Sequence, residues 1–268
     1  MGPVRAKLLY FWAYMIKIYP KSKQASGSFN FGRILEHKPI GFPQDGGELK
    51  PYSSLFYWAH AWSDDGGLID QHPHKGFEIM SYVLKGEIEH FDNKLNGWKK
   101  LKAGDVQVIR AGNGIVHAEK LLSGSAMFQI WFDPDLNKTL SQPASYNDHA
   151  SSELPVTRQP GIVIKHVKGG NSPFNIESKV DFIQDWTVTG RTKMLDLDHK
   201  FIYSACVISG ELEIDGKPLA TGDFFMLQDL SEVSLNPLEK ESRLFVIKTP
   251  KDIGFKTYFE FMTTNAKS

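Results

Sequence analysis

Short runs of alternating apolar and polar residues, separated by turn residues, dominate the chain between positions 77 and 132. The runs cover residues 79–84, 87–91, 106–109 and 127–132, and glycine-containing turns such as Lys85-Gly86 and Ala103-Gly104-Asp105 lie between them. Alternation with a period of two residues is typical of strands that bury one face. Many short strands without intervening helical periods predict a β-sandwich or β-barrel.

A second stretch of the chain repeats this pattern. Residues 83–89 (VLKGEIE) are echoed by 207–213 (VISGELE), and residues 101–106 (LKAGDV) by 219–224 (LATGDF). Internal duplication is the simplest explanation of such self-similarity. The sequence therefore predicts an all-β protein with two tandem domains of the same kind, joined through a Ser-, Asn- and Pro-rich segment at 141–160. We place the domains at residues 15–145 and 146–268.

Residues 1–14 precede the first predicted domain. Arg5 and Lys7 precede an apolar stretch at 8–16, which superficially resembles a signal peptide but is too short to span a bilayer and is followed by lysines instead of a small-residue cleavage site. Residues 15–19 (MIKIY) have the pattern of a first strand. We expect residues 1–14 to be an extension of little functional weight, and the sequence leaves open whether they are native.

Composition and charge exclude several classes of partner. The chain has 268 residues, of which 41% are hydrophobic, and 31 basic residues balance 31 acidic ones. A neutral balance gives no indication of direct nucleic-acid binding or attraction to anionic membranes. The single cysteine, Cys206, excludes an internal disulfide and fits a reducing, cytoplasmic location. Because it lies in the apolar run 201–208, we expect a buried, unreactive thiol.

Two pairs of residues carry the candidate chemistry. His72 and His74 are two positions apart, as are His117 and Glu119, and both pairs fall on strand-like segments. Side chains at i and i+2 point to one face of a strand, so two such pairs can close on a single metal ion. Three imidazoles and a carboxylate suit Fe(II), Mn(II), Ni(II), Cu(II) or Zn(II), and the absence of thiolates argues against a structural zinc site.

The remaining histidines lack such a partner, and we interpret them as structural or solvent-facing; they are His37, His60, His90, His149, His166 and His199. The second repeat also lacks the pairs. Offsets measured from the repeated glycines place Asp196 and Asp198 where the first repeat has its two histidines, and Leu235 and Pro237 where it has His117 and Glu119. Leucine and proline cannot bind a metal, so the second domain is predicted to be metal-free.

The two motifs resemble those of a known superfamily. The series of glycines, histidines and Glu78 between positions 66 and 117 resembles the two motifs of the cupins, which fold into jelly-roll barrels. The variants HPHKGFE at 72–78 and AGNGIVHAE at 111–119 are similar to those of the pirins, a bicupin family with metal in the N-terminal half only. The resemblance covers residues 15–262 and implies His72, His74, His117 and Glu119 as metal ligands. Glu78, a ligand in the general cupin pattern, would instead hydrogen-bond a ligand imidazole or form a salt bridge within its strand.

The resemblance also implies an activity. Pirin-like proteins are associated with quercetin 2,3-dioxygenase activity, in which dioxygen opens the heterocyclic ring of a flavonol with loss of carbon monoxide. Fe(II) is the expected ion, with Mn, Ni, Cu and Zn as alternatives. Four protein ligands leave one or two positions open for substrate, and Glu119 could serve as the base. Aromatic residues that could line a pocket, or simply form core, are Phe56, Trp58, Phe77, Phe128 and Trp131.

Two other functions remain open. The first is a non-catalytic, iron-dependent regulator that senses redox state and binds a transcription factor or a metabolic enzyme. The second is a metal-dependent isomerase of the kind found among sugar-binding cupins, against which only the context of the first histidine pair argues. Jelly rolls host many chemistries, so the fold does not decide among these functions.

Overall fold

The computed structural model describes residues 15–94 and 96–265, and strands make up most of this part of the chain. The expected extension at 1–14 lies outside the described residues. Two short α-helices, α1 (Leu136–Thr139) and α2 (Tyr258–Asn265), and three 3-10 turns, η1 (Lys21–Lys23), η2 (Asn30–Gly32) and η3 (Ser151–Glu153), occur among the described residues. No helix in this part of the chain has the length and apolarity needed to cross a membrane.

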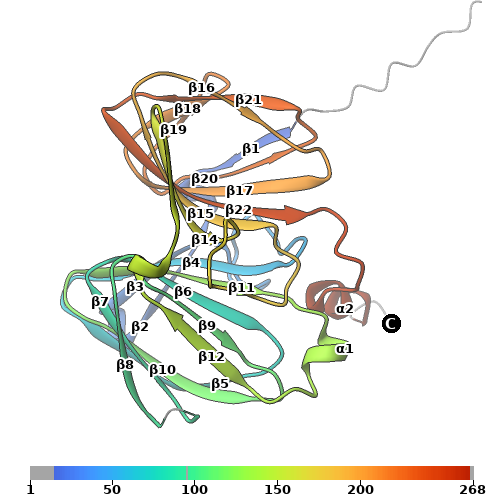
Figure 1. Ribbon diagram of the computed structural model, residues 1–268. Helices are drawn as coiled ribbons and strands as arrows, with labels where there is room; N and C mark the ends of the chain where they lie inside the picture. The colour runs from blue at the N-terminus through green and yellow to red at the C-terminus, as the bar shows by residue number, and fades with distance from the viewer. Residues whose placement is uncertain (1–14, 95, 266–268) are drawn as a thin grey trace, which may run out of the picture.

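The first unit consists of a large and a small antiparallel sheet (Figure 1). The large sheet has the order β12 (Ser145–His149), β9 (Val106–Arg110), β6 (Glu78–Lys85), β11 (Ser125–Phe132), β4 (Leu55–Ser63), β3 (Ile34–Ile40) and β2 (Ala25–Phe29). The small sheet has the order β5 (Gly67–His74), β10 (Ile115–Leu121), β7 (Glu87–Asp92) and β8 (Gly97–Lys102).

The second unit repeats this architecture. Its large sheet has the order β1 (Met15–Tyr19), β20 (Phe224–Gln228), β17 (Phe201–Ser209), β22 (Glu241–Pro250), β15 (Phe182–Thr189), β14 (Ile162–Lys168) and β13 (Val156–Gln159). Its small sheet has the order β16 (Lys193–Asp196), β21 (Glu232–Pro237), β18 (Leu212–Ile214) and β19 (Lys217–Leu219). Each unit thus consists of one seven-stranded and one four-stranded sheet, which confirms the predicted all-β fold with two tandem jelly-roll barrels.

Backbone conformation explains why the repeated motif contains glycine. Gly86 and its counterpart Gly210 have φ values of +70° and +81°, a region that side chains with a Cβ rarely adopt. A Cβ at Gly86 would also lie 3.0 Å from the Cα of Ser125, and one at Gly210 would lie 2.9 Å from the Cα of Ser242. Both turns therefore require glycine for the same two reasons, which preserves the repeat in the sequence.

Strands at both ends of the first unit cross the domain boundaries placed from the sequence. The segment 15–19 forms a strand, β1, as predicted, but it pairs with β20 of the second unit. The boundary between residues 145 and 146 falls inside β12, which pairs with β9 of the first unit. The N-terminal strand thus completes the second barrel, whereas the linker begins only after β12.

The two large sheets pack face to face and form the main core of the molecule. Trp58 of β4 is fully buried between the units, with ring centroids 5.6 Å from Phe128, 5.2 Å from Phe224 and 5.9 Å from Phe245. Cys206 lies in the same core, and burial raises the pKa of its thiol to about 12. The expectation of a buried thiol is confirmed.

Candidate metal centre

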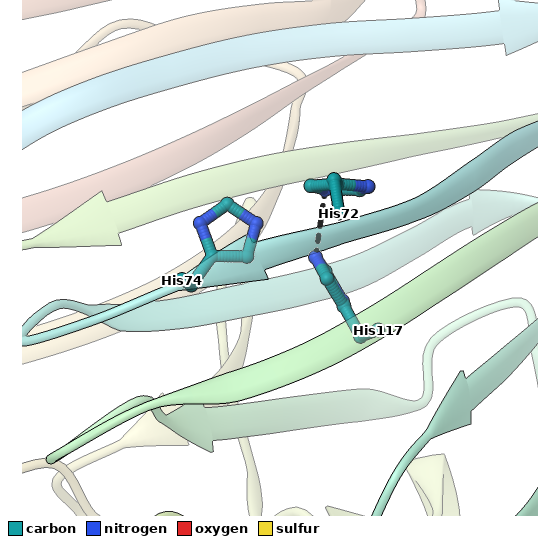
Figure 2. A group of neighbouring side chains, drawn as sticks. All are labelled: His72, His74 and His117. Carbon is teal, nitrogen blue, oxygen red and sulfur yellow. Dashed lines mark hydrogen bonds between the residues drawn. The ribbon is translucent and has the colours of Figure 1, made fainter.

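Three of the predicted metal ligands converge between two neighbouring strands of the small sheet. His72 and His74 lie on β5 and His117 on β10, and His72 faces His117 directly across the antiparallel pair. Figure 2 shows the three imidazoles turned toward one another. Their ring centroids are 4.4 to 4.8 Å apart, and each ring offers a nitrogen within 4.8 Å of the nitrogens of the other two. The two-residue spacing of His72 and His74 therefore places both on one face, as predicted.

The geometry of His72 and His117 fits chelation of a single ion. Nδ1 of His72 lies 2.7 Å from the backbone carbonyl oxygen of Asp70, to which it donates, so Nε2 keeps its lone pair. This Nε2 atom lies 2.9 Å from Nε2 of His117 (Figure 2). Two nitrogens bound at right angles to a metal about 2.1 Å away would be about 3 Å apart. The pair is thus already at the spacing that a shared metal requires.

Two of the imidazoles, those of His74 and His117, are also held in the neutral form that metals bind. Burial lowers the pKa of His74 to about 3 and that of His117 to about 2, and the neighbouring histidines add to both effects. Nε2 of His74 and Nδ1 of His117 are buried without a hydrogen-bond partner in the described structure. A buried nitrogen without a partner costs free energy, which a bound metal would recover at His74.

Glu119, the fourth predicted ligand, lies on β10 two residues after His117, beyond a bulge in the pairing with β5. Its carboxylate is 1% exposed and accepts hydrogen bonds from Ser81 Oγ at 3.1 Å and from Nε2 of Gln129. Gln129 in turn accepts a hydrogen bond from the indole of Trp131. Glu119 shares a second possible metal-binding group with His117 and His90, which overlaps the histidine triad at His117.

His90 is the residue that the sequence interpretation overlooked. It is 1% exposed, its Nε2 lies 3.0 Å from a carboxylate oxygen of Asp92, and its buried Nδ1 has no hydrogen-bond partner in the described structure. On the paired strands β7 and β10, His90 lies opposite Glu119, and Asp92 lies opposite His117. The signal was available, because His90 and Asp92 have the same two-residue spacing as the predicted pairs.

Glu78 takes no part in the histidine cluster. Its buried carboxylate accepts hydrogen bonds from the backbone N–H groups of Glu177 and Ser178 and from the Ser178 hydroxyl, at 2.6 to 2.8 Å. Arg110 lies 3.5 Å away on the neighbouring strand. Of the two alternatives for Glu78, the structure agrees with the salt-bridged strand residue. Burial raises the pKa of this carboxyl, and its hydrogen bonds oppose that effect.

The aromatic residues expected near the metal divide into two groups. Trp131 packs edge-on against His74, with ring centroids 4.6 Å apart, and Phe56 and Phe77 continue this cluster toward Tyr258 of α2. Trp58 and Phe128 belong instead to the core between the large sheets, so they cannot line a pocket at the metal centre. The opening beside His74 is a shallow depression of about 390 Å³.

The second barrel has apolar residues where the first has its cluster. Leu235 on β21 lies opposite Ile214, just as His117 lies opposite Asp92. Both residues are buried in an apolar core that fills the barrel, and in this unit the described residues contain no group of three metal-binding side chains. The structure pairs Lys193 with Leu235, as it pairs His72 with His117 in the first unit. The offset from Gly210 that assigned Asp196 to the position of His72 was therefore three residues too short, and Asp196 and Asp198 are exposed.

Parts of this chain are similar in sequence to known proteins. Residues 49–132 match the family model described as Pirin. Pirin-like protein 2 of Arabidopsis thaliana is 38% identical over 103 residues, which cover 37% of this chain but only 30% of the relative. A Pseudomonas aeruginosa protein provisionally named quercetin 2,3-dioxygenase is 28% identical over 194 residues, 69% of this chain and 81% of its own length.

A solved structure extends the similarity to both barrels. The bacterial pirin YhhW from Escherichia coli, in complex with nickel(II), superimposes with a TM-score of 0.72 and 19% identity, covering 88% of this chain and 100% of the other. At this identity the match shows the fold, and the fold is that of a bicupin.

Proposed function

We propose that this chain, which carries a pirin domain at residues 49–132 within a bicupin fold, is a metal-dependent dioxygenase that opens the heterocyclic ring of a flavonol such as quercetin. The observation that supports this proposal best is the cluster of imidazoles from His72, His74 and His117, of which the last two are held neutral by burial. Two similar proteins also support it: the Pseudomonas aeruginosa relative is named for quercetin 2,3-dioxygenase activity, and the Escherichia coli pirin was solved in complex with nickel(II).

In the proposed site, His72, His74, His117 and Glu119 hold one divalent ion. When bound, such an ion lowers the pKa of a coordinated hydroxyl and supplies the redox partner that dioxygen chemistry needs. Fe(II) is our first choice, and Mn, Ni, Cu and Zn are alternatives that the same donor set accepts. Three imidazoles and one carboxylate leave room for a substrate at an ion that prefers five or six ligands.

The side chains around the cluster would accept a proton from the substrate and hold the ligand imidazoles in place. Glu119 would accept the proton of the flavonol hydroxyl, because Ser81 and Gln129 hold its carboxylate at the edge of the cluster. Trp131 would support the imidazole of His74 by edge-on packing. Dioxygen is the oxidant and supplies the oxygen added to the product, and one ring carbon leaves as carbon monoxide.

A quercetin bleaching assay tests this proposal. Protein reconstituted anaerobically with Fe(II) and then mixed with quercetin and air should bleach the flavonol absorbance and release carbon monoxide. His117→Ala should abolish the bleaching together with metal binding. Glu119→Gln, which retains an oxygen ligand, should bind metal but bleach at least about 100-fold more slowly, in the range expected for a lost general base. A fully metal-loaded protein that leaves quercetin intact would refute the dioxygenase proposal.

One observation favours the alternative of a non-catalytic, redox-sensing regulator that binds a protein partner. The depression beside His74 is open, whereas small-molecule sites generally enclose most of the ligand. In this case, oxidising the iron-loaded protein with ferricyanide should alter amide hydrogen exchange at residues 74–75 and 114–116, and quercetin should remain intact. Exchange that does not respond to oxidation would exclude the regulatory alternative.

A further inference from the structure

A second cavity, remote from the histidine cluster, lies between the two units. It has a volume of about 280 Å³ and opens where β3, β4 and β11 of the first unit meet β17 and the turn before β20 of the second. Its walls include His60, Trp62 and Phe128 on one side and Cys206 on the other. A cavity of this size accommodates a molecule with one or two rings.

Strand alternation explains why polar groups reach this cavity. Trp58, His60 and Trp62 are two residues apart on β4, so all three point away from the first barrel and toward the second unit. Trp58 is fully buried in the core, whereas His60 and Trp62 are only partly buried because the packing between the sheets opens around them. The cavity is therefore the unfilled continuation of the core between the units.

The two imidazoles in this cavity, His37 and His60, have no hydrogen-bond partner among the described residues. His37 lies directly opposite His60 on the paired strands β3 and β4. Both rings pack against Trp62, whose ring centroid is 5.2 Å from that of His37 and 5.5 Å from that of His60. In the described part of the chain, no hydrogen bond involves a ring nitrogen of either histidine. Burial lowers the pKa of His60 to about 4, with smaller effects from His37 and Lys21, so its ring is neutral at pH 7 and offers one N–H donor.

Among the described residues, one basic side chain lines the same space. Lys21 of η1 lines the cavity with its aliphatic stem over Gly222, where a Cβ would lie 2.7 Å from Lys21 Cε. No carboxylate lines the cavity, and Lys21 has no ion pair within residues 15–94 and 96–265. A cation without a partner at the rim of an aromatic pocket favours an anionic ligand.

We propose that this cavity binds a small aromatic carboxylate, with its ring against Trp62 and Phe128 and its carboxylate accepting hydrogen bonds from Lys21 and a histidine N–H. Binding is non-covalent, because the thiol of Cys206 at the cavity wall is buried and protonated. The site is separate from the proposed metal centre: His60, Trp62 and Phe128 lie on the large sheet, whereas His72, His74 and His117 lie on the small sheet.

Calorimetric titration of the full chain with 2-naphthoate tests the proposal, with the neutral isostere 2-naphthalenemethanol as the matched ligand. We expect 2-naphthoate to bind at least about tenfold more tightly than the alcohol, since only the anion can pair with Lys21. Lys21→Met should raise the Kd about tenfold, and His60→Phe, which keeps a ring of similar size, should raise it severalfold. Lys17→Met removes an equal charge from an exposed position on β1 that does not line the cavity and should leave the Kd unchanged.

The position of the ligand is tested with His117→Ala. This variant disables the proposed metal centre, so unchanged affinity for 2-naphthoate supports a second site, whereas lost affinity would place the ligand at the metal centre and overturn the proposal. Equal affinity for naphthoate and its alcohol, or a Kd unaffected by Lys21→Met, would also overturn it. None of these results depends on quercetin turnover, so the outcome is independent of the proposed dioxygenase activity.

Discussion

Nε2 of His72 and Nε2 of His117 face each other at 2.9 Å across the β5–β10 pair. Without metal, one of these nitrogens donates a hydrogen bond to the other. With metal, both lone pairs would point at the ion, and the observed spacing is close to the separation of about 3 Å that two nitrogen ligands of one ion would need. Because the paired backbone sets this spacing, the centre needs little rearrangement to accept an ion.

Removal of His117 should therefore eliminate metal binding without unfolding the barrel. In protein purified without added metal, we expect about one equivalent of metal in the unmodified chain and less than about a tenth of that in His117→Ala, measured by elemental analysis. His199→Ala, which alters an exposed histidine of the second unit, is the matched control and should retain full metal content. Equal metal content in the two variants would contradict the assignment.

Gln129 should matter for metal affinity although it is not a predicted ligand. Gln129→Met removes the donor to Glu119 at nearly constant volume, and loss of such a supporting hydrogen bond typically weakens metal binding about 10- to 100-fold. Competition with a chromophoric chelator measures this change. Gln184→Met is the control, because Gln184 also accepts a hydrogen bond from an indole, that of Trp186, but lies in the second unit, away from the histidine cluster. A similar loss of affinity in both variants would mean that the effect is not specific to Glu119.

Trp58 should be a principal contributor to the stability of the whole chain. Trp58→Ala empties a fully buried position between the two units, and we expect the free energy of unfolding in urea to fall by about 3–5 kcal/mol. The indole N–H has no hydrogen-bond partner in the described structure, so the loss is one of packing. Trp98→Ala, at a side chain that is 49% exposed, should change stability by no more than about 0.5 kcal/mol. Comparable losses would show that the packing between the units contributes little.

Asp133 should make the chain more stable as the pH falls from 7 to 4. Burial raises the pKa of this carboxyl from 3.8 to about 6, in spite of the hydrogen bond it accepts from the backbone N–H of Tyr258. Between these two pKa values the folded state binds a proton that the unfolded state does not, so this group's contribution to the free energy of unfolding increases with acidification, by about 3 kcal/mol at most.

Urea unfolding between pH 4 and 7 measures this effect. In Asp133→Asn the amide oxygen can still accept the Tyr258 hydrogen bond. As the pH falls from 7 to 4, the unmodified chain should therefore gain stability relative to this variant. Asp196→Asn, at an exposed position, should not alter the pH dependence. A pH-independent difference for Asp133→Asn would contradict the raised pKa.

Local spacing made much of the fold and site predictable. Alternating apolar residues indicated the strands, the repeated glycine turns indicated the duplication, and the two-residue spacing of His72 and His74 placed both on one strand face. These features depend on residues close together in the chain. Whether Glu119 joins the three imidazoles on one ion stays a prediction, because the described structure groups its carboxylate with His117 and His90.

Features that depend on distant partners were not predictable in this way. Glu78 finds its hydrogen-bond donors at Glu177 and Ser178, about 100 residues later in the chain. The strand β1 could be identified from its own alternation, but nothing in that pattern specifies β20 as its partner. The spacing of His90 and Asp92 was a local signal, but the position of His90 opposite Glu119 comes from the pairing of β7 with β10, which that spacing does not specify.

The two barrels exchange their terminal elements. β1 adds an edge strand to the second barrel, and α2 lies beside the first (Figure 1). The ring centroid of Tyr258 in α2 is 5.4 Å from that of Phe77 in the first unit. If the chain were expressed as two fragments divided within the linker, the first fragment would carry β1 without its partner β20, and the second would carry α2 without the surface on which it packs. Such fragments should be insoluble when expressed singly and should recover native packing when expressed together. This interlocking gives a physical reason for the second barrel, whose described residues contain no cluster of metal-binding side chains, to be retained beside the first, because the two fold as one unit.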